Sequence, residues 1–337
     1  MTGPAKPKSA LFYDYPLSNG VVYTPEARAR IAALTDPYPE VINAGNFDDH
    51  AAALADVEIV FATWGLMPFE ERHFAALPKL KAVFYAAGNV KAFARPLIDR
   101  DIVLVSAWQA NAIPVAEMCL SQILLSLRGY FRAVRQYRDV HITAAARAFT
   151  HPGVNGATVG LLGVGKIGTR LRRLLRDYPL RVIAYDPFLT AERAAELGIE
   201  SVAMDAVFER ADVVSNHIPD IPETRGVLTE RQFAAMRSGA TFINTGRGAQ
   251  VVEEDLIRVL RARTDLTALL DVTMPEPPVN GSPLWDLPNV IVSPHVGGTV
   301  GDECPRLSAL ALDEFERWMR GEPLTQQVTA EVLATMG

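Results

Sequence analysis

Cysteines and metal-binding patterns are scarce in this sequence of 337 residues. Only two cysteines occur, Cys119 and Cys304, far apart and in apolar, helix-like surroundings. This count argues against a disulfide framework, and we expect two reduced, buried thiols in a cytoplasmic protein. No C-x-x-C, H-E-x-x-H or comparable ligand spacing is present. We therefore predict that the protein binds no metal.

The sequence also lacks a strong charge of one sign and a long uninterrupted apolar run. Its net charge of −6 gives no reason to expect a nucleic-acid surface. The N-terminal residues MTGPAKPKSA contain no apolar leader segment. The most apolar long segment, residues 115–127, is interrupted by Glu117, Ser121 and Gln122. It predicts a core helix and not a membrane span, so we expect no membrane partner.

The composition is that of a folded protein with a large core. Apolar residues make up 49% of the chain and charged residues 21%, which excludes a disordered chain. The length suits two domains of ordinary size.

A glycine-rich stretch at residues 157–175 carries the first functional signal. Thr158–Leu162 has the apolar character of a buried strand, and Gly163, Gly165 and Gly168 follow at G-x-G-x-x-G spacing before a helical apolar pattern. In a dinucleotide fold, the first glycine permits the tight turn and the second lets the backbone approach a pyrophosphate. The third lets the helix pack closely on the sheet. A simple glycine-rich turn is the alternative interpretation.

The residues after this helix favour the dinucleotide interpretation. A second strand pattern, residues 181–185, ends at Asp186, about where such folds place a carboxylate on the adenosine ribose. The charge of Asp186 would repel a 2′-phosphate, and Pro187 and Phe188 supply no arginine to bind one. We therefore predict NAD and not NADP as the cofactor.

Strand and helix patterns alternate before and after the glycine loop, which indicates parallel sheets covered by helices. In the first half, strands are predicted at 10–13, 57–62, 81–85 and 102–105, and helices at 25–34 and 69–77. In the second half, strands are predicted at 212–216, 241–244, 267–272 and 289–292. A long helix is expected from about 113 to 137, an irregular arm over 131–154, and an amphipathic helix over 304–319.

This order predicts a discontinuous first domain. Residues 1–110 and 302–337 would form it, and residues 111–301 would form an inserted dinucleotide-binding domain. A cleft between two such domains is a natural place for a substrate.

Three segments of the second half end a predicted strand and carry a side chain suited to chemistry. Arg247 lies between two glycines and can clamp a carboxylate. Glu276 lies among prolines, and His295 follows a strand and precedes two glycines. Taken singly, each has a structural alternative: a surface arginine, a rigid turn and a structural histidine. Taken together, they can bind a carboxylate, hold an imidazole and exchange a proton beside a nicotinamide.

An ordered set of motifs resembles the D-isomer-specific 2-hydroxyacid dehydrogenases, most closely over residues 105–300. The set comprises Asn111-Ala-Ile-Pro-Val-Ala-Glu117, Gly163-Val-Gly-Lys-Ile-Gly168, His217-Ile-Pro219 with Glu223-Thr-Arg-Gly226, Asn244-Thr-Gly-Arg-Gly248, Leu270-Asp-Val272 with Glu276-Pro277, and Ser293-Pro-His-Val-Gly-Gly298. The family includes glyoxylate and hydroxypyruvate reductases, D-lactate dehydrogenase and phosphoglycerate dehydrogenase. The resemblance implies an NAD-dependent oxidoreductase that interconverts a 2-keto acid and a D-2-hydroxy acid, most readily as a glyoxylate- or hydroxypyruvate-type reductase.

The resemblance also implies roles for individual residues. Arg247, Glu276 and His295 match the catalytic arginine, glutamate and histidine, and Ala87, Gly88, Arg247 and His295 match substrate-binding positions. The cofactor-binding positions are matched by Gly163, Gly165, Lys166, Ile167, Gly168, Asp186, His217, Pro219, Thr224, Thr245, Gly246, Arg247, Asp271, His295, Gly297 and Gly298. The implied α/β fold has two Rossmann-like domains, with the NAD-binding domain inserted into a discontinuous, flavodoxin-like substrate domain. A homodimer is implied as well.

Two departures from the family pattern and two alternatives stay open. Thr273-Met274-Pro275 replaces the usual aromatic and acidic residues before Glu276, and the arm at 131–154 has no tryptophan. An NAD(H)-sensing scaffold resembling co-repressors of this fold is one alternative, and a formate- or phosphite-type dehydrogenase is the other. We expect no regulatory domain after residue 337.

Overall fold

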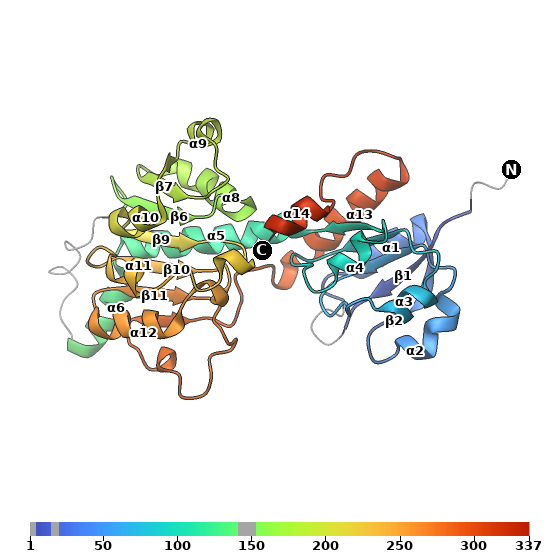
Figure 1. The fold of residues 1–337 in the computed structure, drawn as a ribbon, viewed down its shortest axis with the longest axis horizontal. Coiled ribbons are helices and arrows are strands. Elements are labelled where there is room, and N and C mark those ends of the chain that lie inside the picture. The colour runs from blue at the N-terminus through green and yellow to red at the C-terminus, as the bar shows by residue number, and fades with distance from the viewer. Residues whose placement is uncertain (1–4, 15–19, 141–152, 337) are drawn as a thin grey trace. The chain divides into compact units, whose positions relative to one another are not determined.

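The computed structural model describes residues 5–14, 20–140 and 153–336, which divide into two compact units (Figure 1). Unit 1 comprises Met1–Asn111 and Thr299–Met336, and unit 2 comprises Ala112–Gly298. The chain thus passes from unit 1 to unit 2 after Asn111 and returns to unit 1 at Thr299. The sequence analysis predicted these two crossings near residues 110 and 302. Unit 1 is therefore discontinuous in sequence, and unit 2 is inserted into it.

Unit 1 contains a five-stranded parallel sheet. Its order is β2-β1-β3-β4-β5, the flavodoxin-like arrangement. The strands are β1 (Lys8–Phe12), β2 (Asp36–Ile42), β3 (Ile59–Ala62), β4 (Ala82–Tyr85) and β5 (Val103–Ser106). Apart from β2, they lie within two residues of the predicted positions.

Helices cover both faces of this sheet because alternate side chains of each strand point to opposite sides. On one face Phe61 and Phe84 pack on Phe315, with ring centroids 5.0 and 5.3 Å apart. The helices of this face are α1 (Pro25–Leu34) and α13 (Pro305–Met319). The other face carries α2 (Phe47–His50), α3 (Glu71–Ala76), α4 (Ala94–Ile98) and α14 (Ala330–Thr335).

Unit 2 contains a seven-stranded parallel sheet of order β12-β11-β10-β9-β6-β7-β8. Numbered within the unit, this is 3-2-1-4-5-6 with one further strand, the doubly wound Rossmann order. The strands are β6 (Thr158–Leu162), β7 (Arg181–Tyr185), β8 (Glu200–Ser201), β9 (Val213–Asn216), β10 (Thr241–Asn244), β11 (Thr267–Leu270) and β12 (Val290–Val292). The predicted fold class is therefore confirmed.

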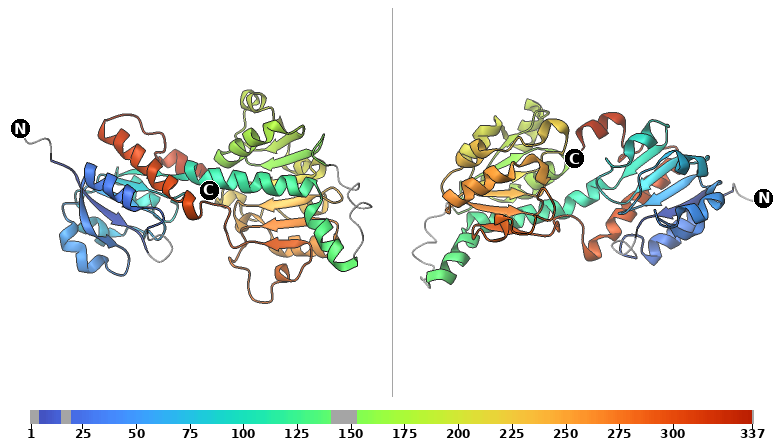
Figure 2. Two further views of the ribbon diagram at one scale, coloured as in Figure 1. Left: turned by 180° about the vertical axis from the view of Figure 1, so that it is seen from behind. Right: turned by 60° about the horizontal axis from the view of Figure 1, so that its bottom comes forward.

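Both faces of the second sheet are also covered. On one face lie α5 (Trp108–Leu127), which runs alongside the strands in Figure 2, α8 (Lys166–Leu174) and α9 (Ala191–Leu197). On the other lie α10 (Met204–Arg210), α11 (Glu230–Ala234) and α12 (Glu253–Ala262). Short 3-10 helices occur at η1 (Ala51–Leu54), η2 (Leu175–Asp177), η3 (Pro222–Thr224), η4 (Gly248–Gln250), η5 (Pro283–Trp285) and η6 (Gly301–Glu303).

The predicted long helix is interrupted. It ends as α5 at Leu127, and α6 (Tyr130–Val140) begins after Gly129, whose φ of 65° lies in the left-handed region. The prediction of irregular structure is thus wrong for residues 131–140, while 141–152 lie outside the described residues. Among the described helices, α5 alone has the length and apolar composition of a membrane span. Its residues Cys119 and Ile123 are buried against the sheet, as in a core helix.

Candidate active site

The carboxyl ends of the unit 2 strands all lie at one edge of the sheet, because the strands are parallel. Every predicted site residue of this unit follows a strand end or begins the next helix. The loops after β6, β7, β9, β10, β11 and β12 carry, in that order, Gly163–Gly168, Asp186, His217–Thr224, Thr245–Arg247, Asp271–Glu276 and His295–Gly298. This is the edge at which open α/β sheets bind ligands.

The three glycines of the loop after β6, Gly163, Gly165 and Gly168, differ in how much space a side chain would have. Gly163 has a φ of 90°, and a Cβ there would lie 2.8 Å from the His217 carbonyl oxygen. A Cβ at Gly168 would lie 2.3 Å from the Gly163 carbonyl oxygen. These are the tight turn and the close helix packing that the spacing predicts. A Cβ at Gly165 would meet no protein atom within 4 Å. Space beside the backbone is therefore open at the position predicted for the pyrophosphate, at the N-terminus of α8.

Asp186 holds the glycine loop from the adjacent strand end. Its Oδ2 accepts a hydrogen bond from Val164 N (2.7 Å), and its Oδ1 accepts one from Phe188 N (2.8 Å). A carboxylate has about four acceptor positions, so both oxygens retain capacity for ribose hydroxyls.

His217 lies beside the same turn and leaves one ring atom without a partner. Its Nε2 is 3.0 Å from Ser215 Oγ, whereas its Nδ1 is buried with no hydrogen bond to any described residue. Burial lowers the pKa of His217 to about 4. Nearby, Thr224 Oγ1 donates to the Pro219 carbonyl (2.6 Å). The open side of Gly165, the spare capacity of Asp186 and the unpaired Nδ1 are features that fit a bound dinucleotide.

Buried amide side chains fix the backbone around Arg247. Asn244 Nδ2 donates to the Arg247 carbonyl (3.2 Å), and Gln250 Oε1 accepts from Arg247 N (3.0 Å). Asn216 Nδ2 donates to both Asn244 Oδ1 (3.0 Å) and Gln250 Oε1 (2.9 Å). The loops after β9 and β10 are thereby joined into one polar network. Thr245 Oγ1 lies 3.3 Å from the thiol of Cys119.

Gly248 brings the Arg247 loop into backbone contact with the loop that carries Glu276. A Cβ at Gly248 would lie 2.0 Å from the Thr273 carbonyl carbon and 2.5 Å from Met274 N. No side chain larger than hydrogen fits in this contact without moving one loop. Burial lowers the pKa of Arg247, while the charges of Asp220 and Glu276 act in the opposite direction. The guanidinium nevertheless stays protonated at any relevant pH.

His295 and Glu276 form a direct pair at the same edge. His295 Nδ1 donates to Glu276 Oε1 at 2.6 Å, and the two side chains are 47% and 39% exposed. Because Nδ1 is occupied by the carboxylate, Nε2 is the ring atom left for proton exchange. The structure thus pairs Glu276 with His295 and packs the loop that carries Arg247 against the loop that carries Glu276.

Asp271 anchors the loop that carries His295. Its Oδ1 accepts hydrogen bonds from Ser293 Oγ (2.6 Å) and Val296 N (2.9 Å), and its Oδ2 accepts one from Gly297 N (2.7 Å). The Asp271 side chain is buried, and between the anchored positions His295 takes a φ of 52°. The cofactor contact that the resemblance implies for Asp271 stays a prediction, and the structure shows that its carboxylate also holds the histidine loop.

The other predicted positions lie as follows. Lys166 and Ile167 begin α8, where Ile167 packs against the core, and a Cβ at Gly246 would lie 3.1 Å from Asn216 Nδ2. In unit 1, Ala87 and Gly88 follow β4. Gly298 is the last residue of unit 2.

Sequence reasoning missed Asn216, Asn244, Gln250 and Ser293 as residues that position the site. A signal for the first two was present, because each ends a predicted strand and the two are register partners in the sheet. Gln250 combines a local contact with Arg247 N and distant contacts with Asn216 and Ile218, whereas Ser293 acts through Asp271, which is 22 residues away in the sequence.

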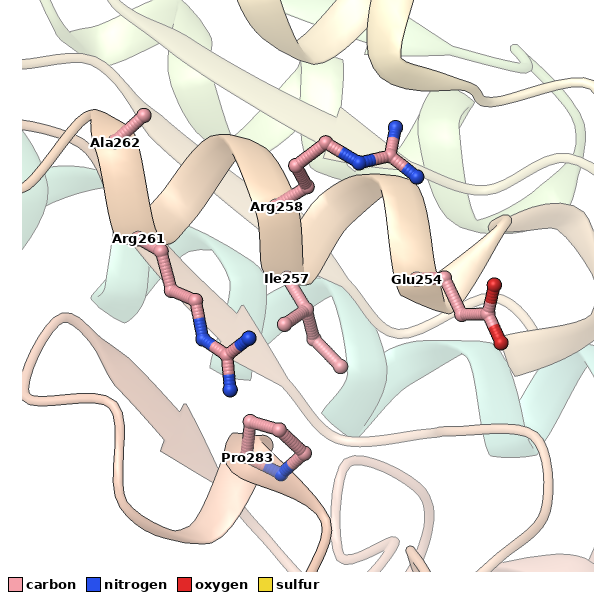
Figure 3. A pocket seen from close by; sticks show the side chains of 6 residues that line it. All are labelled: Glu254, Ile257, Arg258, Arg261, Ala262 and Pro283. Atoms are coloured by element: carbon pink, nitrogen blue, oxygen red, sulfur yellow. The ribbon is translucent and has the colours of Figure 1, made fainter.

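A surface depression of about 590 Å³ lies on α12, away from the residues predicted for the site (Figure 3). Ile257 and Pro283 line it, and Figure 3 shows Arg261 directed from α12 toward Pro283. Arg258, at its border, forms ion pairs with Glu230 and Asp255. No group of three metal-ligating side chains occurs within the described parts of the chain.

Comparison with known proteins agrees with this geometry. Residues 120–297 match the model of the D-isomer specific 2-hydroxyacid dehydrogenase NAD binding domain. D-3-phosphoglycerate dehydrogenase of Mycobacterium leprae is 33% identical over 260 residues, which cover 76% of this chain and 48% of that protein. The chain therefore spans about half the length of the curated relatives it matches.

Solved structures show the same fold at lower identity. A phosphoglycerate oxidoreductase from Rhizobium etli superposes with a TM-score of 0.79 at 22% identity, over 97% of this chain and 100% of that one. The D-mandelate dehydrogenase of Rhodotorula graminis gives 0.78 at 22% identity, over 96% and 98%. The chain belongs to the family of D-isomer-specific 2-hydroxyacid dehydrogenases, which are NAD-dependent and act on CH–OH groups, and unit 2 is its NAD-binding domain.

Proposed function

We propose that this protein interconverts a 2-keto acid and a D-2-hydroxy acid with NAD, acting mainly as a reductase of small 2-keto acids. The 2.6 Å pair between His295 and Glu276 supports this proposal most directly. It leaves the other imidazole nitrogen for proton exchange, and Arg247 lies on a loop that contacts the loop carrying Glu276. Such a set suits a substrate that needs a proton at one oxygen and a cation at its carboxylate. The preference for glyoxylate or hydroxypyruvate rests on the resemblance alone.

The roles follow from the residues themselves. In the reductive direction, His295 Nε2 gives a proton to the substrate carbonyl oxygen, and Glu276 stabilises the protonated ring through Nδ1. Arg247 binds the substrate carboxylate and draws electron density from the carbonyl. The backbone amides of Ala87 and Gly88 contribute further donors for the carboxylate. NAD, held by the glycine loop and Asp186, supplies the hydride chemistry when bound.

A panel of 2-keto acids with NADH tests the proposal. Glyoxylate, hydroxypyruvate, pyruvate, phenylpyruvate and 2-ketoisocaproate would be compared, with NADPH in parallel. We add 3-phosphohydroxypyruvate because the curated relatives above are D-3-phosphoglycerate dehydrogenases. Turnover with NADH supports the reaction class. Bound NADH without turnover of any member would favour a scaffold role instead, and a preference for NADPH would contradict the role of Asp186.

His295→Ala isolates the acid/base role. We expect kcat to fall about 10²–10⁴-fold, the usual worth of a general acid, while the Kd for NADH stays nearly unchanged. His50→Gln is the matched control, because His50 pairs with Tyr38 in unit 1 and has no place in the mechanism. An equal loss of NADH affinity in His295→Ala would argue that His295 serves the cofactor and not the proton transfer.

A further inference from the structure

The bend at residues 86–89 after β4 has its carbonyl groups held by two buried hydroxyls. Thr63 Oγ1 donates to the Ala86 carbonyl at 2.8 Å. Ser106 Oγ shares its proton between the carbonyls of Ala87 (2.9 Å) and Gly88 (2.6 Å). Three successive carbonyls of the bend therefore point toward the inside of unit 1.

Both hydroxyls come from the strands that flank β4 in the sheet. Thr63 directly follows β3, and Ser106 is the last residue of β5. Each is fully buried, with 0% of its surface exposed. A buried hydroxyl needs a partner, so the two side chains and the three carbonyls satisfy one another and fix the bend from both sides.

The direction of these carbonyls determines the direction of the amides. In a trans peptide, the C=O of one residue and the N–H of the next point to opposite sides of the same plane. With the carbonyls of Ala86, Ala87 and Gly88 turned inward, the N–H groups of Ala87, Gly88 and Asn89 point outward. None of these three N–H groups donates to another described residue, although Ala87 itself is buried.

Successive amides that point the same way without acceptors form a site for an anion. Ala87 is buried, and buried N–H groups rarely lack a partner in a folded protein, so an acceptor from a ligand is expected at its amide. The anion would be bound by backbone N–H groups, but the hydroxyls of Thr63 and Ser106 hold the backbone in the orientation that presents them. Without these hydroxyls, the carbonyls would be free to turn outward and present negative charge to the same ligand.

We propose that Thr63 and Ser106 are positioning residues for the substrate: they fix the 86–89 bend so that its amides, and not its carbonyls, meet the substrate carboxylate. This inference rests on the proposed function, because it assigns the anion to the carboxylate of a 2-keto acid. It predicts that the two hydroxyls set carboxylate affinity while neither touches substrate or cofactor.

Thr63→Val and Ser106→Ala remove the hydroxyls with little change in volume. We expect each to raise KM for the 2-keto acid, and the inhibition constant of the unreactive analogue oxamate, about 5–10-fold, the worth of about one hydrogen bond. The kcat and the Kd for NADH should change less than about twofold. Thr63→Ser keeps the hydroxyl and should restore wild-type KM.

Ser9→Ala is the matched control. Ser9 is a buried hydroxyl of the same sheet whose partner is Thr35 (2.8 Å), remote in sequence from the bend. It should lower the free energy of unfolding without raising KM. If Thr63→Val and Ser106→Ala behave like Ser9→Ala, or if kcat and NADH affinity fall together with the rise in KM, the hydroxyls are merely structural and the proposal is wrong.

Oxamate binding separates this proposal from the assigned reaction. Titration of the wild-type protein with oxamate, followed by the NMR signals of the Ala87 and Gly88 amides, needs no turnover. A saturable shift that weakens in Thr63→Val and Ser106→Ala supports the positioning role even if no 2-keto acid is reduced. No shift in the wild type would overturn it, even if the enzyme is active.

Discussion

The bend at 86–89 in unit 1 and the loop at 293–297 in unit 2 are both anchored by buried polar side chains, but through opposite halves of the peptide group. In unit 1, the donors Thr63 and Ser106 hold carbonyls. In unit 2, the acceptor Asp271 holds the N–H groups of Val296 and Gly297. The hydroxyls of unit 1 therefore satisfy carbonyl groups and leave N–H groups unbound, whereas Asp271 satisfies N–H groups.

The difference determines what each segment can offer a ligand. Once its carbonyls are satisfied, the 86–89 bend offers N–H donors, so small residues suffice there and no charged side chain is needed. Once its N–H groups are satisfied, the 293–297 loop has no donors to offer and acts through a side chain, His295. The polarity of a buried anchor can therefore indicate whether a segment binds through its backbone or through its side chains.

Asp271→Asn should weaken the hydrogen bonds that hold the 293–297 loop, and we expect it to reduce kcat more than Gly248→Ala does. The amide places an NH₂ donor against backbone N–H groups, so one of the three hydrogen bonds becomes a repulsive contact. We expect kcat to fall about 100-fold, because a small misplacement of a catalytic group has that effect, and stability to fall by about 2 kcal/mol. Steady-state kinetics and urea unfolding measure the two quantities.

Asp265→Asn provides the matched control for this change. Asp265 also accepts a backbone N–H, from Gly239 (3.0 Å), but it precedes β11 and so lies at the opposite edge of the sheet from the site. It should lower stability and leave kcat unchanged. Equal loss of kcat in both variants would mean that Asp271 acts only through overall stability.

Gly248→Ala should disturb the site through backbone packing, where no polar anchor is involved. The added methyl would overlap the Thr273 carbonyl carbon, 2.0 Å away, so the loop that carries Glu276 must move. We expect kcat to fall about tenfold with a smaller change in the Kd for NADH. Gly45→Ala is the control, because its Cβ would meet only one side-chain atom, Asn43 Oδ1 at 3.2 Å, in a turn of unit 1. Wild-type kcat in Gly248→Ala would show that the Glu276 loop tolerates displacement.

His217 should contribute to stability in a way that depends on pH. Its pKa of about 4 in the folded protein lies below the ordinary 6.5. The unfolded chain therefore binds a proton in this window that the folded chain does not, and stability falls as the pH falls from 6.5 toward 4. We expect up to about 2 kcal/mol of this loss by about pH 5. Urea unfolding should show a flatter dependence for His217→Phe than for His50→Gln; equal slopes would contradict the role of His217.

The positions of most strands along the chain and the loops that carry the candidate site residues could be predicted from the sequence, because both depend on local patterns. The strand-ending residues Asp186, Arg247 and His295 needed only the knowledge that parallel strands end at one edge. Strand β2 was missed because Pro37 and Pro39 argue against a strand; it lies at the edge of the sheet, where proline is tolerated. The break between α5 and α6 was missed because a single glycine in an apolar helical pattern is ambiguous.

The positioning contacts of Ser106 and Asp271 could not be predicted, because each joins residues distant in sequence. Ser106 meets the Ala87 and Gly88 carbonyls only after β4 and β5 pair in register, and Asp271 meets Val296 only after β11 and β12 pair. A serine or an aspartate at a strand end has many possible partners. Which of them it meets depends on the packed structure and not on local composition.

The two hydrogen bonds of Asp186 carry a consequence for protein engineering. Because the carboxylate predicted to bind the ribose also accepts a hydrogen bond from Val164 N in the glycine loop, redesign toward NADP cannot treat position 186 as a free surface site. Replacing Asp186 by a residue that can bind a 2′-phosphate also removes the acceptor of Val164 N in the glycine loop. A successful redesign needs a second substitution that supplies a new acceptor for Val164 N. Evolution from NAD to NADP specificity would need the same pair of changes.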